Sequence, residues 1–95
     1  MSAKKQLEFS ARSIVNMGAI KQHIATDNPV AASRVIDAVF AAADELLHFP
    51  MIGRAGRRSG TRELVLPHYP YTLIYRLTEI KVLIVAVVHQ SRKNF

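Results

Sequence analysis

Apolar residues recur every three or four positions through much of the N-terminal half, which is the spacing of one face of an α-helix. Ahead of this region, Gln6-Leu7-Glu8-Phe9 alternates polar and apolar residues and predicts a half-buried strand. Ser10 can cap a helix that runs to about Thr26, because its side-chain oxygen can accept an orphan backbone N–H. We expect the buried stripe of this helix to contain Ile14, Met17, Ile20 and Ile24.

A second helix begins sharply at Asn28-Pro29. Pro29 suits the first helical position, and the Asn28 side chain can cap the helix. Two amphipathic helices joined by about two residues form an antiparallel hairpin, and its apolar stripe needs a further layer to cover it. The apolar residues of the second helix keep the three-four spacing without a miss: Ala32, Val35, Ile36, Val39, Phe40, Ala43, Leu46 and Leu47.

The C-terminal half has the spacing of strands and supplies the missing layer. It follows a Gly-, Arg- and Ser-rich segment after Phe49 that we expect to be one long irregular loop. Strands are predicted from Thr61 to Leu66 and from Tyr71 to Leu77, with a turn at Pro67-His68-Tyr69-Pro70 between them. In the second of these strands, alternation places one set of side chains on each face: Tyr71, Leu73, Tyr75 and Leu77 on one, and Thr72, Ile74 and Arg76 on the other.

The last segment, Ile80 to His89, is apolar almost without break, which is typical of a central strand covered on both faces. Tyr71 and Tyr75 are therefore expected in the core, since alternate aromatic residues on a strand usually pack there. The order strand, helix, helix and three strands predicts a single α+β domain over residues 1–95. In this β-α-α-β-β-β arrangement, a helical hairpin packs on a mainly antiparallel sheet.

Charge divides the chain into two unequal halves. Residues 1–47 contain five Lys or Arg and five Asp or Glu, so the formal net charge of +6 comes entirely from residues 48–95. A concentrated positive field of this kind favours an acidic partner. Cysteine is absent, which excludes disulfides and thiolate metal sites, and no secretory signal is visible, so we expect a cytoplasmic protein.

Cofactor chemistry finds no support in the sequence. The four histidines, His23, His48, His68 and His89, have no ligand spacing, and we expect no metal site. The glycines at Gly53, Gly56 and Gly60 are not followed by the Lys-Ser/Thr of a phosphate loop. We therefore expect no cofactor.

Five segments, taken in order, resemble the RelE/ParE toxin superfamily over roughly residues 9 to 93. They are Asp27-Asn28-Pro29 with Ala31-Ala32, Leu46-x-x-x-Pro50-x-x-Gly53-Arg54, Gly60-Thr61-Arg62-Glu63-Leu64-Val65, Pro70-Tyr71-Thr72-Leu73-Ile74-Tyr75-Arg76, and Val87-Val88-His89-Gln90-Ser91-Arg92-Lys93. The resemblance implies the toxin of a bacterial type II toxin–antitoxin pair, held inactive by a small cognate antitoxin. RelE-like toxins cleave messenger RNA on the ribosome, whereas ParE-like toxins poison DNA gyrase and block replication.

Thr72 favours the gyrase branch. RNA cleavage without a metal needs a base for the 2′-hydroxyl and a cation for the charged phosphorane. RelE-like toxins carry that cation, an Arg, at the strand position that Thr72 occupies here, and a neutral hydroxyl cannot replace a guanidinium on phosphate. The Gly-Thr-Arg-Glu-Leu block and the Pro-Tyr segment also look more like ParE. The resemblance thus implies a non-enzymatic inhibitor of gyrase.

Candidate contact residues follow from this interpretation. The target-binding candidates are Arg62, Arg76, His89, Gln90, Ser91, Arg92 and Lys93, and the candidates for binding an acidic antitoxin are Arg54, Arg57 and Arg58. Each has a plainer alternative: Arg62 and Arg76 could pair with Glu63, Glu79 or a helix carboxylate, and the three loop arginines could simply be solvated.

Two other functions stay open. The first is a RelE-like ribonuclease with His89, Arg62 and Arg92 as catalytic residues, because an unperturbed His titrates near neutral pH and can serve as a general base. His89 could equally be a strand-end residue bonded to backbone or facing water. The second is a simple nucleic-acid-binding module, which the high pI permits but no recognition-helix pattern supports.

Overall fold

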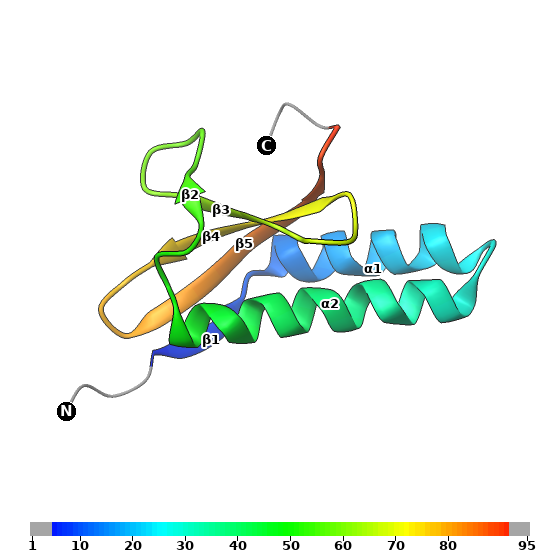
Figure 1. Cartoon of the computed structure of the whole chain (residues 1–95), viewed down its shortest axis with the longest axis horizontal. Coiled ribbons are helices and arrows are strands. Elements are labelled where there is room, and N and C mark those ends of the chain that lie inside the picture. Colours follow the sequence, from blue (N-terminus) through cyan, green and yellow to red (C-terminus); the bar gives the residue numbers. More distant parts are fainter. Residues whose placement is uncertain (1–4, 92–95) are drawn as a thin grey trace.

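Five strands and two helices make up residues 5–91, which are the residues that the computed structural model describes. The helices lie together as an antiparallel pair on one face of the sheet (Figure 1). Neither of them is long and apolar enough to cross a membrane. The elements in chain order are β1 (Gln6–Phe9), α1 (Ala11–Ala25), α2 (Pro29–His48), β2 (Arg54–Ala55), β3 (Arg62–Val65), β4 (Tyr71–Leu77) and β5 (Lys81–His89).

Both helices begin at the caps that the sequence predicts. The Ser10 side chain accepts the backbone N–H of Ser13 at 3.1 Å and donates to the Val85 carbonyl at 2.7 Å, so the cap also fastens α1 to β5. Asn28 Oδ1 accepts the backbone N–H of Ala31 at 3.0 Å, with Pro29 at the start of α2.

The buried stripe of α2 is confirmed except at Phe40, which is 48% exposed, and the stripe of α1 is confirmed except at Ile14. Ala32, Val35, Val39, Ala43 and Leu46 of α2 are all buried. In α1, Met17 is buried but Ile14 is 57% exposed, and the neighbouring Ser13 is fully buried instead. Ser13 fits this position because it is small and because its hydroxyl donates to the Ser10 carbonyl at 2.8 Å.

The sheet has the order β1-β5-β4-β3-β2, in which β5 is an interior strand between β1 and β4. β1 pairs with β5 in parallel, and the remaining pairs are antiparallel, which confirms a mainly antiparallel sheet. The pairing of β4 with β5 shifts by one residue between Ile74 and Tyr75, at a β-bulge that leaves Val85 unpaired.

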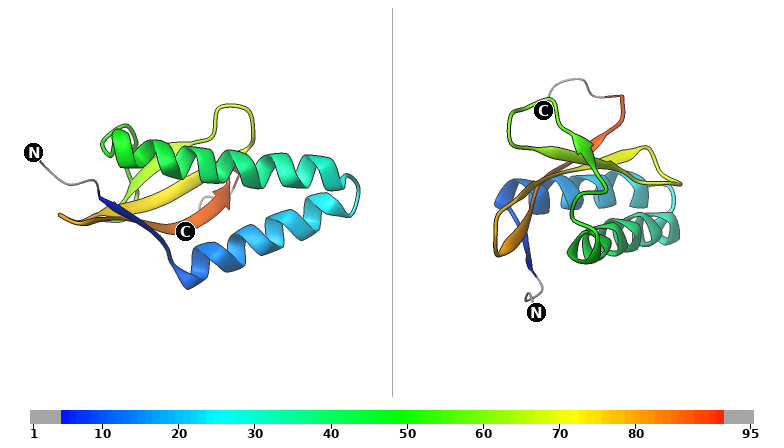
Figure 2. Two further views of the ribbon diagram at one scale, coloured as in Figure 1. Left: turned by 90° about the horizontal axis from the view of Figure 1, so that it is seen from below. Right: turned by 60° about the vertical axis from the view of Figure 1, so that its left-hand side comes forward.

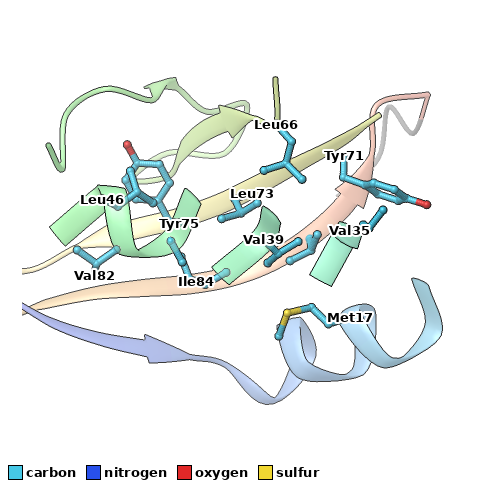
Figure 3. Close-up of a cluster of buried hydrophobic side chains, with 12 residues drawn as sticks. Met17, Val35, Val39, Leu46, Leu66, Tyr71, Leu73, Tyr75, Val82 and Ile84 are labelled. Atoms are coloured by element: carbon cyan, nitrogen blue, oxygen red, sulfur yellow. The ribbon is translucent and has the colours of Figure 1, made fainter. Parts of the chain in front are cut away.

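The hydrophobic core lies between the helical pair and the sheet (Figure 3). Tyr71 and Tyr75 belong to it, as predicted, with exposures of 8% and 0%. In Figure 3 the core side chains of β4 and β5 point towards those of α2, and Met17 closes the cluster from α1. The labelled residues are Met17, Val35, Val39, Leu46, Leu66, Tyr71, Leu73, Tyr75, Val82 and Ile84.

The segment after α2 is not the single irregular loop that its composition predicts. Arg54–Ala55 forms the short strand β2, which pairs with Glu63 and Arg62 of β3. The loop between β2 and β3 is closed by a hydrogen bond from the Gly56 N–H to the Thr61 carbonyl at 2.8 Å. A side chain at position 56 would collide with Thr61, so glycine is required for this closure. Figures 1 and 2 show this loop on the side of the sheet away from the helices.

Candidate functional site

The sheet face away from the helices carries a shallow cleft of about 290 Å³. Strand alternation and register place Glu63, Val65, Thr72, Ile74 and Val88 on this face. The β2 segment and the end of β5 complete the rim. We call this site the open-face cleft, lined by Arg54, Arg57, Glu63, Val65, Thr72, Ile74, Val88, His89 and Gln90.

A buried carboxylate, Glu63, organises the cleft. The Glu63 side chain is only 8% exposed, yet it sits in the most basic segment of the chain. One carboxylate oxygen lies 3.3 Å from the guanidinium of Arg54, and the other accepts the backbone N–H of Arg57 at 3.2 Å. A buried carboxylate is stable only when such partners satisfy it. Glu63 therefore ties both β2 and the following loop to the sheet.

The three arginines predicted to bind the antitoxin, Arg54, Arg57 and Arg58, lie on β2 and on the loop that Glu63 holds. Arg54 and Arg57 both line the open-face cleft, and Arg58 follows on the same loop. Arg54 is not a merely solvated loop residue, because it forms the ion pair with Glu63 while its side chain stays 68% exposed. The Arg58 carbonyl accepts hydrogen bonds from the N–H and the hydroxyl of Thr61 at 3.1 and 2.7 Å, which fixes the loop backbone.

Arg62 lies on the opposite face of β3 from Glu63. Its guanidinium donates to the carbonyls of Met51 and Gly53. Tyr75, directly across on β4, holds the same segment: its hydroxyl donates to the Pro50 carbonyl at 2.8 Å and accepts the Gly53 N–H at 3.0 Å. Arg62 thus clamps the chain between α2 and β2 and does not pair with a carboxylate among residues 5–91.

Arg76 is exposed on β4 and points to the same face as Thr72. Within the described part of the chain it forms no ion pair, so the alternatives of pairing with Glu63, Glu79 or a helix carboxylate are not realised. One of its terminal nitrogens lies close to Gly60. Arg76 remains a cation available on the surface near the β2–β3 loop.

Thr72 forms part of the cleft floor. It is 6% exposed and lies between Val65 of β3 and Val88 of β5. The position that a phosphate-gripping Arg would need is therefore occupied by a short neutral side chain with apolar neighbours on both sides. The floor beside it, Ile74, is apolar as well.

His89 stands at the end of β5, where it lines the open-face cleft and a second cleft. Its ring packs edge-on against Tyr71, with ring centroids 5.4 Å apart. The backbone N–H of Ser91 donates to His89 Nδ1 at 3.0 Å, and Ser91 Oγ lies 2.8 Å from the same nitrogen. Because a backbone N–H can only donate, Nδ1 carries the lone pair and the neutral ring has its proton on Nε2. The alternative of a strand-end His bonded to backbone is confirmed.

The second cleft, of about 510 Å³, lies between α1 and the end of β5. Asn16 anchors it, since its Oδ1 accepts the backbone N–H of Val87 at 3.1 Å. This helix-side cleft brings His23 and Ser91 to the same hollow as His89, and its other lining residues are Arg12, Asn16, Ala19, Ile20, Tyr71, Val87 and Val88. The structure thus brings together His89, Gln90 and Ser91, while Arg92 and Lys93 lie outside the described residues.

Glu63 is the central residue that the sequence interpretation missed, because it was considered only as a counterion for other arginines. One signal was present: Glu63 is the sole carboxylate in the segment from Arg54 to Glu63, which holds four arginines. A lone acid in a basic strand segment should be paired and partly buried.

The fold is that of a small α+β domain with a helical hairpin on one face of a sheet, and comparisons with known proteins identify its class. Residues 7–94 match the family described as the ParE toxin of type II toxin-antitoxin system, parDE. The chain is 36% identical over 90 residues to the putative toxin Y4kP of Sinorhizobium fredii, covering 94% of each. It is 30% identical over 87 residues to toxin RelE2 of Caulobacter vibrioides, covering 92% of this chain and 97% of that protein.

Two solved structures share the fold. One is described as the chromosomal ParDE TA system from P. aeruginosa, with a TM-score of 0.81 at 18% identity over 90% of this chain and 96% of that one. The other is the toxin-antitoxin complex RelBE2 from Mycobacterium tuberculosis, with a TM-score of 0.61 at 21% identity over 92% and 99% of the two chains. The chain belongs to the ParE toxin family of type II toxin–antitoxin systems.

Proposed function

We propose that this toxin is a ParE-like poison that binds DNA gyrase in the cytoplasm and blocks replication, without catalysing a reaction of its own. The observation that carries the proposal is the composition of the open-face cleft. Thr72 and Ile74 form a neutral floor, and the guanidinium of Arg54 is already paired with Glu63. A ribonuclease would need a cation aimed at the phosphate from this floor.

The state of His89 supports the same conclusion. A general base needs a lone pair directed at the proton it removes. In His89 the lone pair on Nδ1 already accepts the Ser91 N–H. The ring is instead placed to donate from Nε2, as a contact residue would. We propose a target-binding surface formed by the exposed residues at the end of β5 together with Arg76, which Arg62 supports by holding the segment before β2. Arg92 and Lys93, which lie outside the described residues, are proposed as further target contacts.

A cognate antitoxin is the second partner that we propose. The two solved relatives come from a ParDE TA system and a RelBE2 toxin-antitoxin complex, which supports a partner of this class. Arg54, Arg57 and Arg58 lie together around one loop, so an acidic antitoxin segment is expected to dock there. Its association rate should fall as salt is added, because the field of exposed charges is screened.

A supercoiling assay with purified gyrase tests the proposal. The wild-type toxin should reduce supercoiling, and addition of the antitoxin should restore it. The variant Arg76→Gln should inhibit more weakly than wild type at equal folded concentration. Unimpaired supercoiling at saturating toxin, together with cleavage of messenger RNA on ribosomes, would refute the gyrase assignment.

A RelE-like ribonuclease is the second candidate, because His89 lies at the rim of the same cleft as Arg54 and Arg57. Likeness to a relative named toxin RelE2 also favours it. The variant His89→Gln separates the two functions, with His68→Gln as a control at another exposed histidine. The His89 variant should abolish cleavage by a ribonuclease, whereas it should only weaken a gyrase poison.

A further inference from the structure

The two groups that bind Glu63 are the donors from which proteins build phosphate sites. One carboxylate oxygen receives the guanidinium of Arg54 at 3.3 Å, and the other receives the main-chain N–H of Arg57 at 3.2 Å. Guanidinium groups and loop N–H groups are the usual ligands of phosphate oxygens. Both converge here on one point of the open-face cleft.

The two members of the Arg54–Glu63 ion pair differ strongly in solvent exposure. The Glu63 side chain is held at 8% exposure against the sheet, whereas that of Arg54 is 68% exposed to solvent. A phosphate arriving from solution would find the position between the Arg54 guanidinium and the Arg57 N–H taken by the carboxylate, whereas an acidic antitoxin side chain needs only the exposed part of the Arg54 guanidinium. The Thr61 hydroxyl and the Gly56 N–H both bind carbonyls within the loop, so the loop is ordered around this carboxylate.

We propose that Glu63 is an internal anion that fills a phosphate-type site and so determines the specificity of the cleft. It keeps phosphate groups, whether free or in a nucleic acid, out of the open face and reserves that face for protein partners. This makes Glu63 a second determinant against RNA chemistry, independent of Thr72. It also predicts that removing one negative charge at position 63 uncovers a latent anion site.

Phosphate binding by Glu63→Gln tests this inference, with inorganic phosphate as the probe. The matched control is Glu8→Gln, which removes the same charge from the exposed Lys81–Glu8 ion pair on the other edge of the sheet. We expect E63Q to bind phosphate about tenfold more tightly than wild type, since a competing charged hydrogen-bond acceptor has been removed. The control E8Q should match wild type, and adding Arg54→Gln to E63Q should abolish the gain. A short RNA oligonucleotide in a parallel titration shows whether a nucleic-acid backbone enters as well as free phosphate.

Three results would overturn the inference: equal phosphate binding by folded E63Q and wild type, an equal gain in E8Q, or a gain that survives loss of Arg54. A measurement on the wild-type toxin covers the case in which E63Q does not fold. Amide hydrogen exchange at Arg57 should be slower than at Ser59, because the Arg57 N–H is held by Glu63 whereas the Ser59 N–H donates no hydrogen bond among residues 5–91. Equal exchange at the two amides would show that Glu63 does not fill the site.

The test of the latent phosphate site at Glu63 is independent of the test of the gyrase proposal. Phosphate binding and amide exchange are measured on the isolated toxin and need neither gyrase nor ribosomes. A toxin that fails to inhibit gyrase can still show the latent site, and a gyrase poison can lack it.

Discussion

The side chains on the two faces of the sheet make different kinds of interaction. On the helix face, Leu73, Tyr75 and Ile84 are fully buried among apolar side chains from both helices. On the open face, a cleft with an apolar floor is edged by arginines and organised by the single carboxylate of Glu63. The helix face supplies stability, and under the proposed function the open face supplies charge and shape for binding partners. Substitutions on the two faces should therefore separate loss of folding from loss of function.

Leu73→Ala should give the largest loss of stability, because it deletes a fully buried side chain from the centre of the helix face. We expect a cost of about 2–5 kcal/mol, which is a large part of the total for a small domain. Urea denaturation followed by circular dichroism measures it. Toxicity should fall in proportion to the folded fraction; a folded but inactive L73A protein would contradict the division between the faces.

Tyr75→Phe should have the next largest effect, since its hydroxyl bonds both the Pro50 carbonyl and the buried Gly53 N–H. Leaving these groups without their partner should cost about 1–3 kcal/mol. Tyr71→Phe is the matched control, because the Tyr71 hydroxyl makes no hydrogen bond within the described chain. Thermal unfolding of the two variants gives the comparison, and equal losses would show that the clamp on residues 50–53 adds nothing.

Arg62→Gln should cost about 1 kcal/mol, because it removes the bonds to the carbonyls of Met51 and Gly53. The Arg62→Gln variant should lose inhibition of gyrase only in proportion to its loss of folded protein. The measurement is supercoiling inhibition at a fixed concentration of folded protein. If inhibition falls much further than the loss of stability explains, Arg62 contacts the target directly and is not only a structural residue.

Arg76→Gln should have the smallest effect on stability, within about 0.5 kcal/mol, because this exposed cation forms no ion pair in residues 5–91. Under the proposed function it should nevertheless weaken inhibition of gyrase more than Arg62→Gln does. Comparing the two arginine variants at matched folded concentration tests the division between the faces directly. The opposite ranking would refute it.

Local patterns predicted the elements well because their determinants are local. The Asn28-Pro29 start of α2, its buried residues and the alternation of β4 all depend on neighbours within a few positions. In α1, Met17, Ile20 and Ile24 pack on the core as predicted, and only Ile14 was misjudged, because packing against the rest of the fold decides which residues at the start of a helix are buried. Ser13 is buried where Ile14 was expected to be.

The candidate site was harder to predict because its contacts are between residues distant in sequence. β2 is only two residues long and exists through pairing with β3, so no periodicity could reveal it. The opposite orientations of Arg62 and Glu63 follow from strand alternation, but their partners come from the loop and from the end of α2. Sequence could therefore name the cations without saying which of them serve as scaffold.

The parallel pairing of β1 with β5 has a consequence for how this protein folds during its synthesis. Among the described residues, the first strand pairs only with the last one, β5, which lies inside the sheet between β1 and β4. Folding during translation cannot be completed until Lys81–His89 has emerged from the ribosome, since β1 and β4 both need it as their partner. Each nascent chain therefore lacks the completed sheet until β5 is available, so neither proposed partner, gyrase or the antitoxin, can bind the folded surface before that point.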